Sequence, residues 1–125
     1  MGKFRELKVW QRGKDLAVSI YRTTLQCAFS KDYGLRDQIR RAAVSIPSNI
    51  AEVDELQTDK QAARFFYTAK GSSAEVLTQA IIAFEIGYLT EESFLHIEEE
   101  CQSISGMLTR LIQSRAKSNK RKKQS

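Results

Sequence analysis

The sequence has little from which to build a disulfide framework, a membrane span or a secretory signal. Its two cysteines, Cys27 and Cys101, are too few for a disulfide framework or a zinc ligand set. The longest uninterrupted apolar run, Ala80–Phe84, is far shorter than the roughly 20 residues of a membrane helix. The first residues, Met-Gly-Lys-Phe-Arg-Glu, contain no apolar signal region. These absences predict a cytoplasmic protein without a membrane partner.

Catalytic chemistry is also poorly represented. The single histidine, His96, has Glu92 and Glu100 four residues away on either side, so the three could share one helix face. A metal-binding bundle would require repeated Glu-x-x-His pairs, which the chain lacks. Both cysteines fall on apolar positions of predicted helices, where a thiol usually behaves as a small hydrophobic group. We therefore expect no catalytic residues, no metal and no cofactor, and a protein that is not an enzyme.

Charge, by contrast, is distributed very unevenly. The chain has 20 Lys and Arg against 15 Asp and Glu, a net charge of +5. Residues 1–50 carry ten basic and four acidic side chains, residues 51–100 three and eleven, and residues 101–125 seven and none. The pattern predicts a body with complementary charged faces and a basic C-terminus. Such polarity favours an anionic partner, nucleic acid first, or self-association.

Apolar residues recur at helical spacing almost throughout, and no stretch alternates with the period of a strand. The sequence predicts an all-α fold, an antiparallel up-down-up-down four-helix bundle over residues 1–116. Pro47 lies inside the second pattern, and because the apolar phase continues past it we expect one kinked helix. Thr58 and Thr90 are predicted N-caps, and Gly87 a left-handed C-terminal cap. The expected helices span about residues 7–29, 35–56, 59–86 and 91–116.

The third predicted helix carries more apolar surface than one bundle seam requires. Beside the main stripe, a second line contains Tyr67, Ala74, Ile81 and Tyr88. Either the core face is unusually wide, or part of this surface contacts another subunit.

Two sets of basic residues are candidates for phosphate binding. In the body, Arg36, Arg40 and Arg41 cluster on one flank of the second predicted helix, and Arg12 and Lys14 add charge to the first. Guanidinium groups bind phosphate and stack on bases, which suits RNA. The alternative is that these arginines meet the acidic helices of a neighbouring subunit.

The second set forms a basic flexible tail over residues 117–125, where the apolar pattern has ended. It contains no acidic residue and is expected to contact phosphates without base preference. The alternative is a disordered end that only aids solubility. Its basic residues are Lys117, Lys120, Arg121, Lys122 and Lys123.

Several motifs resemble one known family. The run Gly34–Glu52, which contains Arg-Arg-Ala-Ala-Val-Ser-Ile-Pro-Ser-Asn-Ile-Ala-Glu, is similar to the signature of four-helix-bundle proteins encoded in intervening sequences of bacterial 23S ribosomal RNA genes, also labelled ribosomal protein S23-like. Leu7–Trp10, Phe65–Glu75 and Gly87–Leu89 resemble further motifs of that family. The similarity spans about residues 4–112 and does not include the tail.

The resemblance implies an antiparallel bundle that assembles into a ring or barrel, typically a homopentamer, with no known enzymatic activity. The accessory variability determinants of diversity-generating retroelements are similar in fold and bind RNA and a reverse transcriptase. One position departs from the pattern: where the family usually has Gly after Ile-Ala-Glu, this chain has Val53. A glycine there would permit a positive φ that valine resists.

The sequence therefore favours a non-enzymatic, homo-oligomeric protein that binds RNA or another nucleic acid. Its narrowest form is an accessory factor to a reverse transcriptase of a diversity-generating retroelement. The alternative is a protein-interaction scaffold of the intervening-sequence family with no nucleic-acid role.

Overall fold

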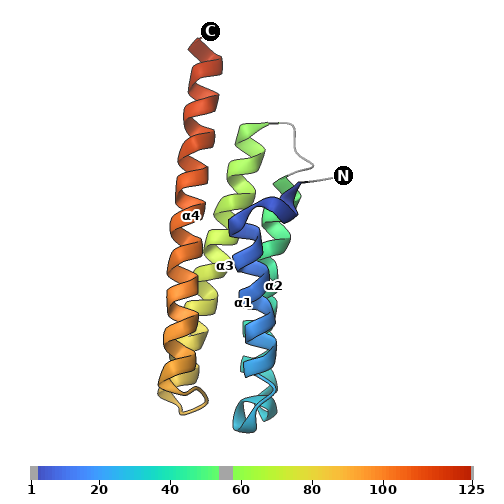
Figure 1. The fold of residues 1–125 in the computed structure, drawn as a ribbon, viewed down its shortest axis with the longest axis vertical. Coiled ribbons are helices and arrows are strands. Elements are labelled where there is room, and N and C mark those ends of the chain that lie inside the picture. The colour runs from blue at the N-terminus through green and yellow to red at the C-terminus, as the bar shows by residue number, and fades with distance from the viewer. Residues whose placement is uncertain (1–2, 54–57, 125) are drawn as a thin grey trace.

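The structure, a computed structural model, describes residues 3–53 and 58–124, except for the side chains of 119 and 122–124. The described chain forms four α-helices whose sequence neighbours run antiparallel, as the apolar pattern predicts (Figure 1). Two short 3-10 helices, Phe4–Glu6 and Cys27–Lys31, precede the first two α-helices. Within the described ranges no helix is both long and apolar enough to cross a membrane. The α-helices are α1 (Lys8–Thr23), α2 (Tyr33–Glu52), α3 (Asp59–Glu85) and α4 (Glu91–Gln124).

The core lies along the predicted apolar stripes. Each α-helix contributes isoleucine, leucine, valine or alanine at steps of three and four residues, so one face of each is buried. On α4, Ile97, Cys101, Ile104 and Leu108 are at most 2% exposed, which confirms the 3.5-residue repeat of that helix. The largest fully buried side chains are Phe29, Phe66, Leu16, Ile20, Ile39, Ile46, Ile50, Ile97, Ile104 and Leu108.

The predicted first helix is too long at its C-terminal end. The helix ends at Thr23, and the chain turns through a separate 3-10 helix before α2. Thr24 is fully buried, and its hydroxyl donates to the Ile20 carbonyl at 2.7 Å, which closes the last turn. Cys27 has a positive φ of 45° and is exposed, so its expected place on an apolar seam is wrong. Phe29 enters the core instead.

The second helix is continuous through Pro47, which confirms one helix rather than two. It begins two residues before the predicted start because the Asp32 carboxylate caps it, accepting from the Leu35 amide at 3.1 Å. Pro47 faces α1 at a close crossing: a Cβ on Gly13 would lie 3.0 Å from Ile46 Cγ2 and 3.6 Å from Pro47 Cδ. The glycine in α1 thus permits the approach of the two helices.

The remaining helix ends agree with the predicted caps. The Thr58 hydroxyl accepts from the Gln61 amide, and the Thr90 hydroxyl from the Ser93 amide, both at 3.1 Å. Gly87 has φ +87°, the left-handed conformation expected of it. The next residue, Tyr88, donates its hydroxyl to Asp32 at 3.0 Å, and this hydrogen bond raises the pKa of Tyr88. The α3–α4 loop is thereby tied to the start of α2.

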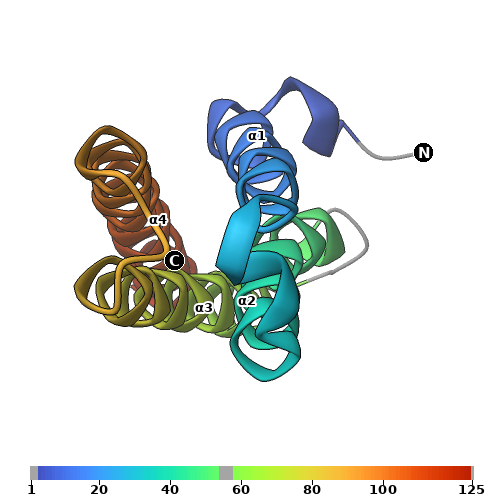
Figure 2. The same cartoon turned by 90° about the horizontal axis from the view of Figure 1, so that it is seen from below.

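The arrangement of the helices is uneven. Viewed along the bundle, α2, α3 and α4 follow one another closely, whereas α1 and α4 diverge (Figure 2). The last turns of α4 continue past the first residues of α3 and stand clear of the other helices (Figure 1). The sequence pattern predicts an end near Ala116, but α4 is helical to Gln124.

Candidate nucleic-acid interface

The two candidate basic residues of α1, Arg12 and Lys14, are paired with acidic residues of the same chain. Arg12 Nη2 lies 2.6 Å from Glu100 Oε2, and Arg12 Nε donates to Oε1 of the same carboxylate at 3.4 Å. The hydrogen bond to Glu100 raises the pKa of Arg12. Lys14 pairs with the adjacent Asp15 at 2.6 Å on the surface. The Arg12 contact joins α1 to α4, the pair of neighbouring helices that diverge.

Two of the three α2 arginines make contacts that organise the turn between α1 and α2. Arg36 donates to Asp37 at 3.0 Å and to the Ser30 carbonyl at 3.1 Å, and its guanidinium lies 4.7 Å from the Tyr33 ring centroid. Arg40 Nε donates to the Thr24 hydroxyl at 2.8 Å, and its guanidinium stacks 4.6 Å from the ring centroid of Tyr21.

The third member of this cluster, Arg41, differs from the other two. It is exposed and lines a polar groove of about 480 Å³ between α2 and α3. Among the described residues no carboxylate lies within ion-pair distance of it. Ser45 and Ser72 form the floor, their hydroxyls 2.9 Å apart. Of the body arginines proposed from sequence, Arg41 is therefore the one left available to an anion.

The basic C-terminal residues follow the point at which α4 loses its helical neighbour. Arg115 Nη1 donates to Asp59 Oδ1 at 3.0 Å, and Asp59 is the first residue of α3. Beyond that contact, Lys117, Lys120 and Arg121 are exposed, and no ion pair within the described part of the chain includes them. Lys122 and Lys123 also belong to α4, but their side chains lie outside the described residues.

The helix can continue past Ala116 for reasons other than apolar packing. Residues 113–124 consist mainly of Lys, Arg, Gln, Ser and Ala, with no proline or glycine, and most of these residues favour helix. Cations near a helix C-terminus also interact favourably with the helix dipole. Composition could have extended the predicted helix, whereas the end of the apolar stripe marks only the end of the bundle.

The acidic and thiol groups considered from sequence are not gathered into one site. His96 and Glu92 are exposed on α4, while Glu100 is engaged by Arg12. In the described residues no three metal-ligating side chains lie close enough to hold an ion. Cys101 is buried, and desolvation raises the pKa of its thiol to about 11, with its own carbonyl accepting from Ser73 at 3.0 Å.

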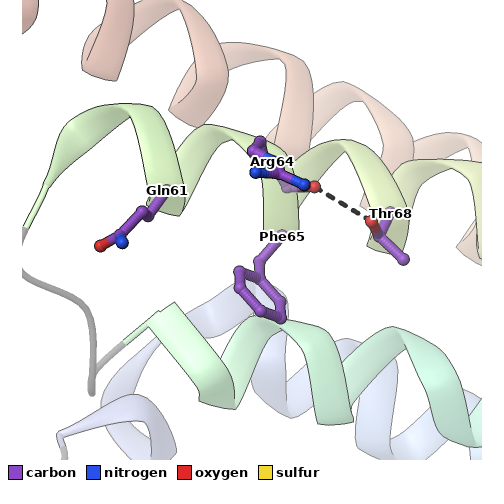
Figure 3. A pocket seen from close by; sticks show the side chains of 4 residues that line it. All are labelled: Gln61, Arg64, Phe65 and Thr68. Carbon is purple, nitrogen blue, oxygen red and sulfur yellow. Dashed lines mark hydrogen bonds between the residues drawn. The ribbon is translucent and has the colours of Figure 1, made fainter.

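Sequence reasoning missed a group of basic residues at the start of α3. Residues 51–100 have a net charge of −8, yet their three cations, Lys60, Arg64 and Lys70, all lie in the first half of that helix. Arg64 is exposed beside Gln61, Phe65 and Thr68 in a shallow groove, where the Phe65 ring extends toward α2 (Figure 3). A count of cations over about half of one helix, in place of a count over fifty residues, would have found them.

Comparison with known proteins identifies the family of the chain. The model of the 23S rRNA-intervening sequence protein family matches residues 5–110. The chain belongs to this family. A crystal structure from Bacteroides thetaiotaomicron, of a protein with unknown function from the S23 ribosomal protein family, superposes with a TM-score of 0.76. The two chains are 22% identical over 83% of this chain and 97% of the other, a likeness of fold. No curated protein matches significantly.

The structure explains how this member of the intervening-sequence family accommodates Val53. The backbone at Val53 has φ −61° and ψ −32°, ordinary right-handed values, and the side chain is 7% exposed. No positive φ is required at this position, so valine extends the core at the end of α2 where a glycine would leave it open. The following Asp54 and Glu55 lie outside the described residues.

Proposed function

We propose that this protein is a non-enzymatic, self-associating scaffold that binds nucleic acid, RNA above all, through the free end of α4. The observation that carries the proposal is the projecting basic helix after Arg115, in which Lys117, Lys120 and Arg121 are exposed. Acidic residues are absent after Glu100, so nothing within the segment neutralises this charge. Lys120 and Arg121 lie three and four residues after Lys117, so the three share one helix face that can follow a phosphate backbone.

Helical structure makes the segment a better ligand for RNA than a coil of the same composition. The cations are already spaced along a stiff element, so less conformational entropy is lost on binding than if a coil had to be ordered. Each phosphate neutralised on a single strand contributes a slope of about −0.7 in log affinity against log salt. In an oligomer several such helices would act together, so weak individual contacts would add through multivalency.

A pair of charge-neutralising substitutions tests this role with a matched control. We expect Lys117→Gln/Arg121→Gln to weaken binding of a labelled RNA and to flatten its salt dependence. Arg22→Gln/Lys31→Gln removes the same charge from exposed residues at the opposite end of the bundle and should leave the slope unchanged. Equal effects of both pairs would show that net charge, not the projecting helix, governs binding.

Self-association is supported by two exposed apolar surfaces of opposite charge at the same end of the bundle. The first surface, on α1, α2 and the turn between them, carries Val18, Tyr21, Leu25 and Val44, which are 41–68% exposed, beside Arg40. The surface around the α3–α4 loop carries Ile81, Ile82, Ile86 and Leu95 beside Glu85, Glu91 and Glu92. Two different complementary surfaces on one chain give head-to-tail contacts, which form a ring where the rotation between subunits closes and an open filament where it does not.

The family resemblance favours five subunits in such a ring. Light scattering of the purified protein tests the count, and Ile86→Asp, at a position 53% exposed, is expected to reduce the assembly to smaller species without unfolding the chain. Thr78→Asp, on an exposed residue of the same helix, is the control for added negative charge. An assembly that survives Ile86→Asp intact would place the contact elsewhere.

A scaffold that never meets nucleic acid is the second candidate, favoured by the intramolecular engagement of Arg12, Arg36 and Arg40. Arg41→Glu separates the two because Arg41 is exposed and makes no contact that folding needs. Loss of the ring with RNA binding retained would assign Arg41 to assembly, and the reverse would assign it to RNA. The narrowest proposal, presentation of RNA to a reverse transcriptase, is tested by co-purification of such an enzyme with the ring.

A further inference from the structure

The start of α3 carries an exposed aromatic ring among cations. Tyr67 is 60% exposed, more than either Val18 or Ile82, and Arg64 and Lys60 lie one and two turns before it on the same helix face. The three residues line a groove of about 290 Å³ whose other wall is formed by Arg115 and Ala116 of α4. The groove therefore lies directly before Lys117, at the root of the projecting helix.

The charge of this groove is positive once internal contacts are considered. Asp59, its one acidic lining residue, is engaged by Arg115 at 3.0 Å and is only 8% exposed at its side chain. Lys60 and Arg64 are exposed, and no ion pair among the described residues includes either. An anionic occupant would thus meet two free cations beside an aromatic face.

Two further grooves continue from this one across α3. Arg64 also lines the groove with Gln61, Phe65 and Thr68 (Figure 3), and Thr68 in turn lines the larger polar groove that contains Arg41. Arg64 borders the first and second grooves and Thr68 the second and third, so the three grooves adjoin one another from the root of the α4 extension to the space between α2 and α3. Cations recur along this path at Lys60, Arg64 and Arg41.

The last groove carries groups that hydrogen-bond the edges of bases. Gln79 donates to Gln38 at 3.5 Å and Ser72 to Ser45 at 2.9 Å, which leaves Gln79 Oε1 without a hydrogen-bond partner among the described residues. Glu75, which lines the same groove, can accept from an exocyclic amino group. In an RNA duplex the Watson–Crick edges are paired and the bases are stacked inside the helix, so bases would not reach into a groove between two α-helices. A single strand with unstacked bases presents both its phosphates and its base edges.

We propose that the three adjoining grooves form a track for single-stranded RNA, in which Lys60, Arg64 and Arg41 contact phosphates and Tyr67 stacks on a base. This inference rests on the proposed function and adds to it a preferred form of nucleic acid and a second binding surface. Basic grooves with interspersed aromatic rings are the usual means of holding single strands. The α4 extension supplies affinity for any phosphate backbone, and the track supplies the preference for single strands.

The test compares an unstructured 12-nucleotide RNA with the same strand annealed to its complement. Tyr67→Ala is expected to weaken binding of the single strand about 5- to 150-fold, since stacking on one base contributes that much, and to leave the duplex unaffected. Tyr67→Phe should retain most single-strand affinity. Tyr33→Ala, at an equally exposed tyrosine (65%) at the far end of the bundle, should retain all of it.

A second variant, Lys60→Gln/Arg64→Gln, tests the phosphate contacts without touching the ring. It should flatten the salt slope for the single strand by about 1.4, corresponding to two phosphates. Oligomeric state is measured for every variant. The track would be overturned if Tyr67→Ala changed the oligomeric state or weakened binding of the duplex as much as binding of the single strand. It would also be overturned if Tyr67→Ala bound RNA as Tyr33→Ala does.

These outcomes also distinguish a failure of the proposed track from a failure of the proposed function. If deletion of residues 117–125 weakens both RNAs while Tyr67→Ala has no effect, the track is wrong and the proposed function stands. If neither change affects either RNA, both are wrong. Displacement of the single strand by an acidic peptide, with no effect of Tyr67→Ala, would assign the grooves to a protein segment and overturn the track.

Discussion

The arginines inside the bundle and the basic residues beyond its end have the same chemistry but different surroundings. Arg12, Arg36 and Arg40 each contact a carboxylate, carbonyl, hydroxyl or aromatic ring of their own chain. Lys117, Lys120 and Arg121 lie where no other helix runs beside α4. A cation enclosed by the fold contributes to the fold, and one outside it remains available to a partner. Position relative to the bundle end, rather than charge count, separates structural from functional cations.

The bundle and the α4 extension should differ most in what they contribute to the free energy of unfolding. Leu108→Ala empties a fully buried position and should lower the free energy of unfolding by about 3 kcal/mol. Deleting residues 117–125 should change it by less than about 0.5 kcal/mol, since Lys117, Lys120 and Arg121 are exposed and contribute little to the core. Urea denaturation measures both. A truncated protein that loses more than about 1 kcal/mol would show that the extension is part of the folded unit.

The two cysteines extend the comparison to uncharged side chains. At pH 8 a thiol of pKa about 11 is about one-thousandth thiolate, so iodoacetamide should modify exposed Cys27 at least about 100-fold faster than Cys101. Mass spectrometry of peptides measures the ratio, and in urea both should react.

The same raised pKa gives a pH dependence of stability. Because the folded value for Cys101 exceeds the 9.0 of an unperturbed thiol, the stabilisation from its neutral form is complete below about pH 9 and is lost as pH rises through 11. If Cys101 in the native protein were labelled as fast as Cys27, the burial of its thiol would be contradicted.

The Arg12–Glu100 contact predicts a moderate effect on folding. Arg12→Gln and Glu100→Gln should each lower stability, and a double-mutant cycle should give a coupling of about 1 kcal/mol for this half-exposed pair. Arg12→Gln should leave the salt slope of RNA binding unchanged, while Lys117→Gln flattens it. If the two substitutions flatten the slope equally, enclosed and projecting cations do not differ in function.

The smallest expected change concerns the local structure of the extension. Ser118→Pro should end α4 early and lower the helical circular dichroism slightly, while the melting temperature stays within about 1 °C of the original. Ser118→Ala is the control and should preserve both. A helical signal that does not fall would mean that residues 118–124 are not helical in solution.

Much of the fold could be predicted from local sequence. The apolar stripes on α2 and α4, the hydroxyl caps at Thr58 and Thr90, and the left-handed Gly87 are short-range patterns, and all are present in the structure. The end of α1 could not be predicted, because it depends on burial of Thr24 and Phe29 against other helices. The end of α4 was predictable only from composition, since the apolar stripe of the helix stops well before Gln124.

The candidate site was less accessible to sequence reasoning. Arg12 pairs with Glu100, which is 88 residues away in the sequence. Counts of charged residues cannot predict such a tertiary contact. The cations at Lys60 and Arg64 were concealed by the acidic average of residues 51–100. The basic residues after Ala116 could be listed from the sequence alone because they form a run without acidic neighbours, and their binding role stays a prediction.

The salt dependence of RNA binding, measured with and without residues 117–125, tests the central claim most directly. The segment carries five cations, each worth a slope of about 0.7 when it neutralises a phosphate of a single strand. We predict that the truncated protein remains folded and oligomeric and that its slope is flatter by about 2 to 3.5. An unchanged slope in a protein that still binds RNA would contradict the assignment of the projecting helix as the phosphate-binding element.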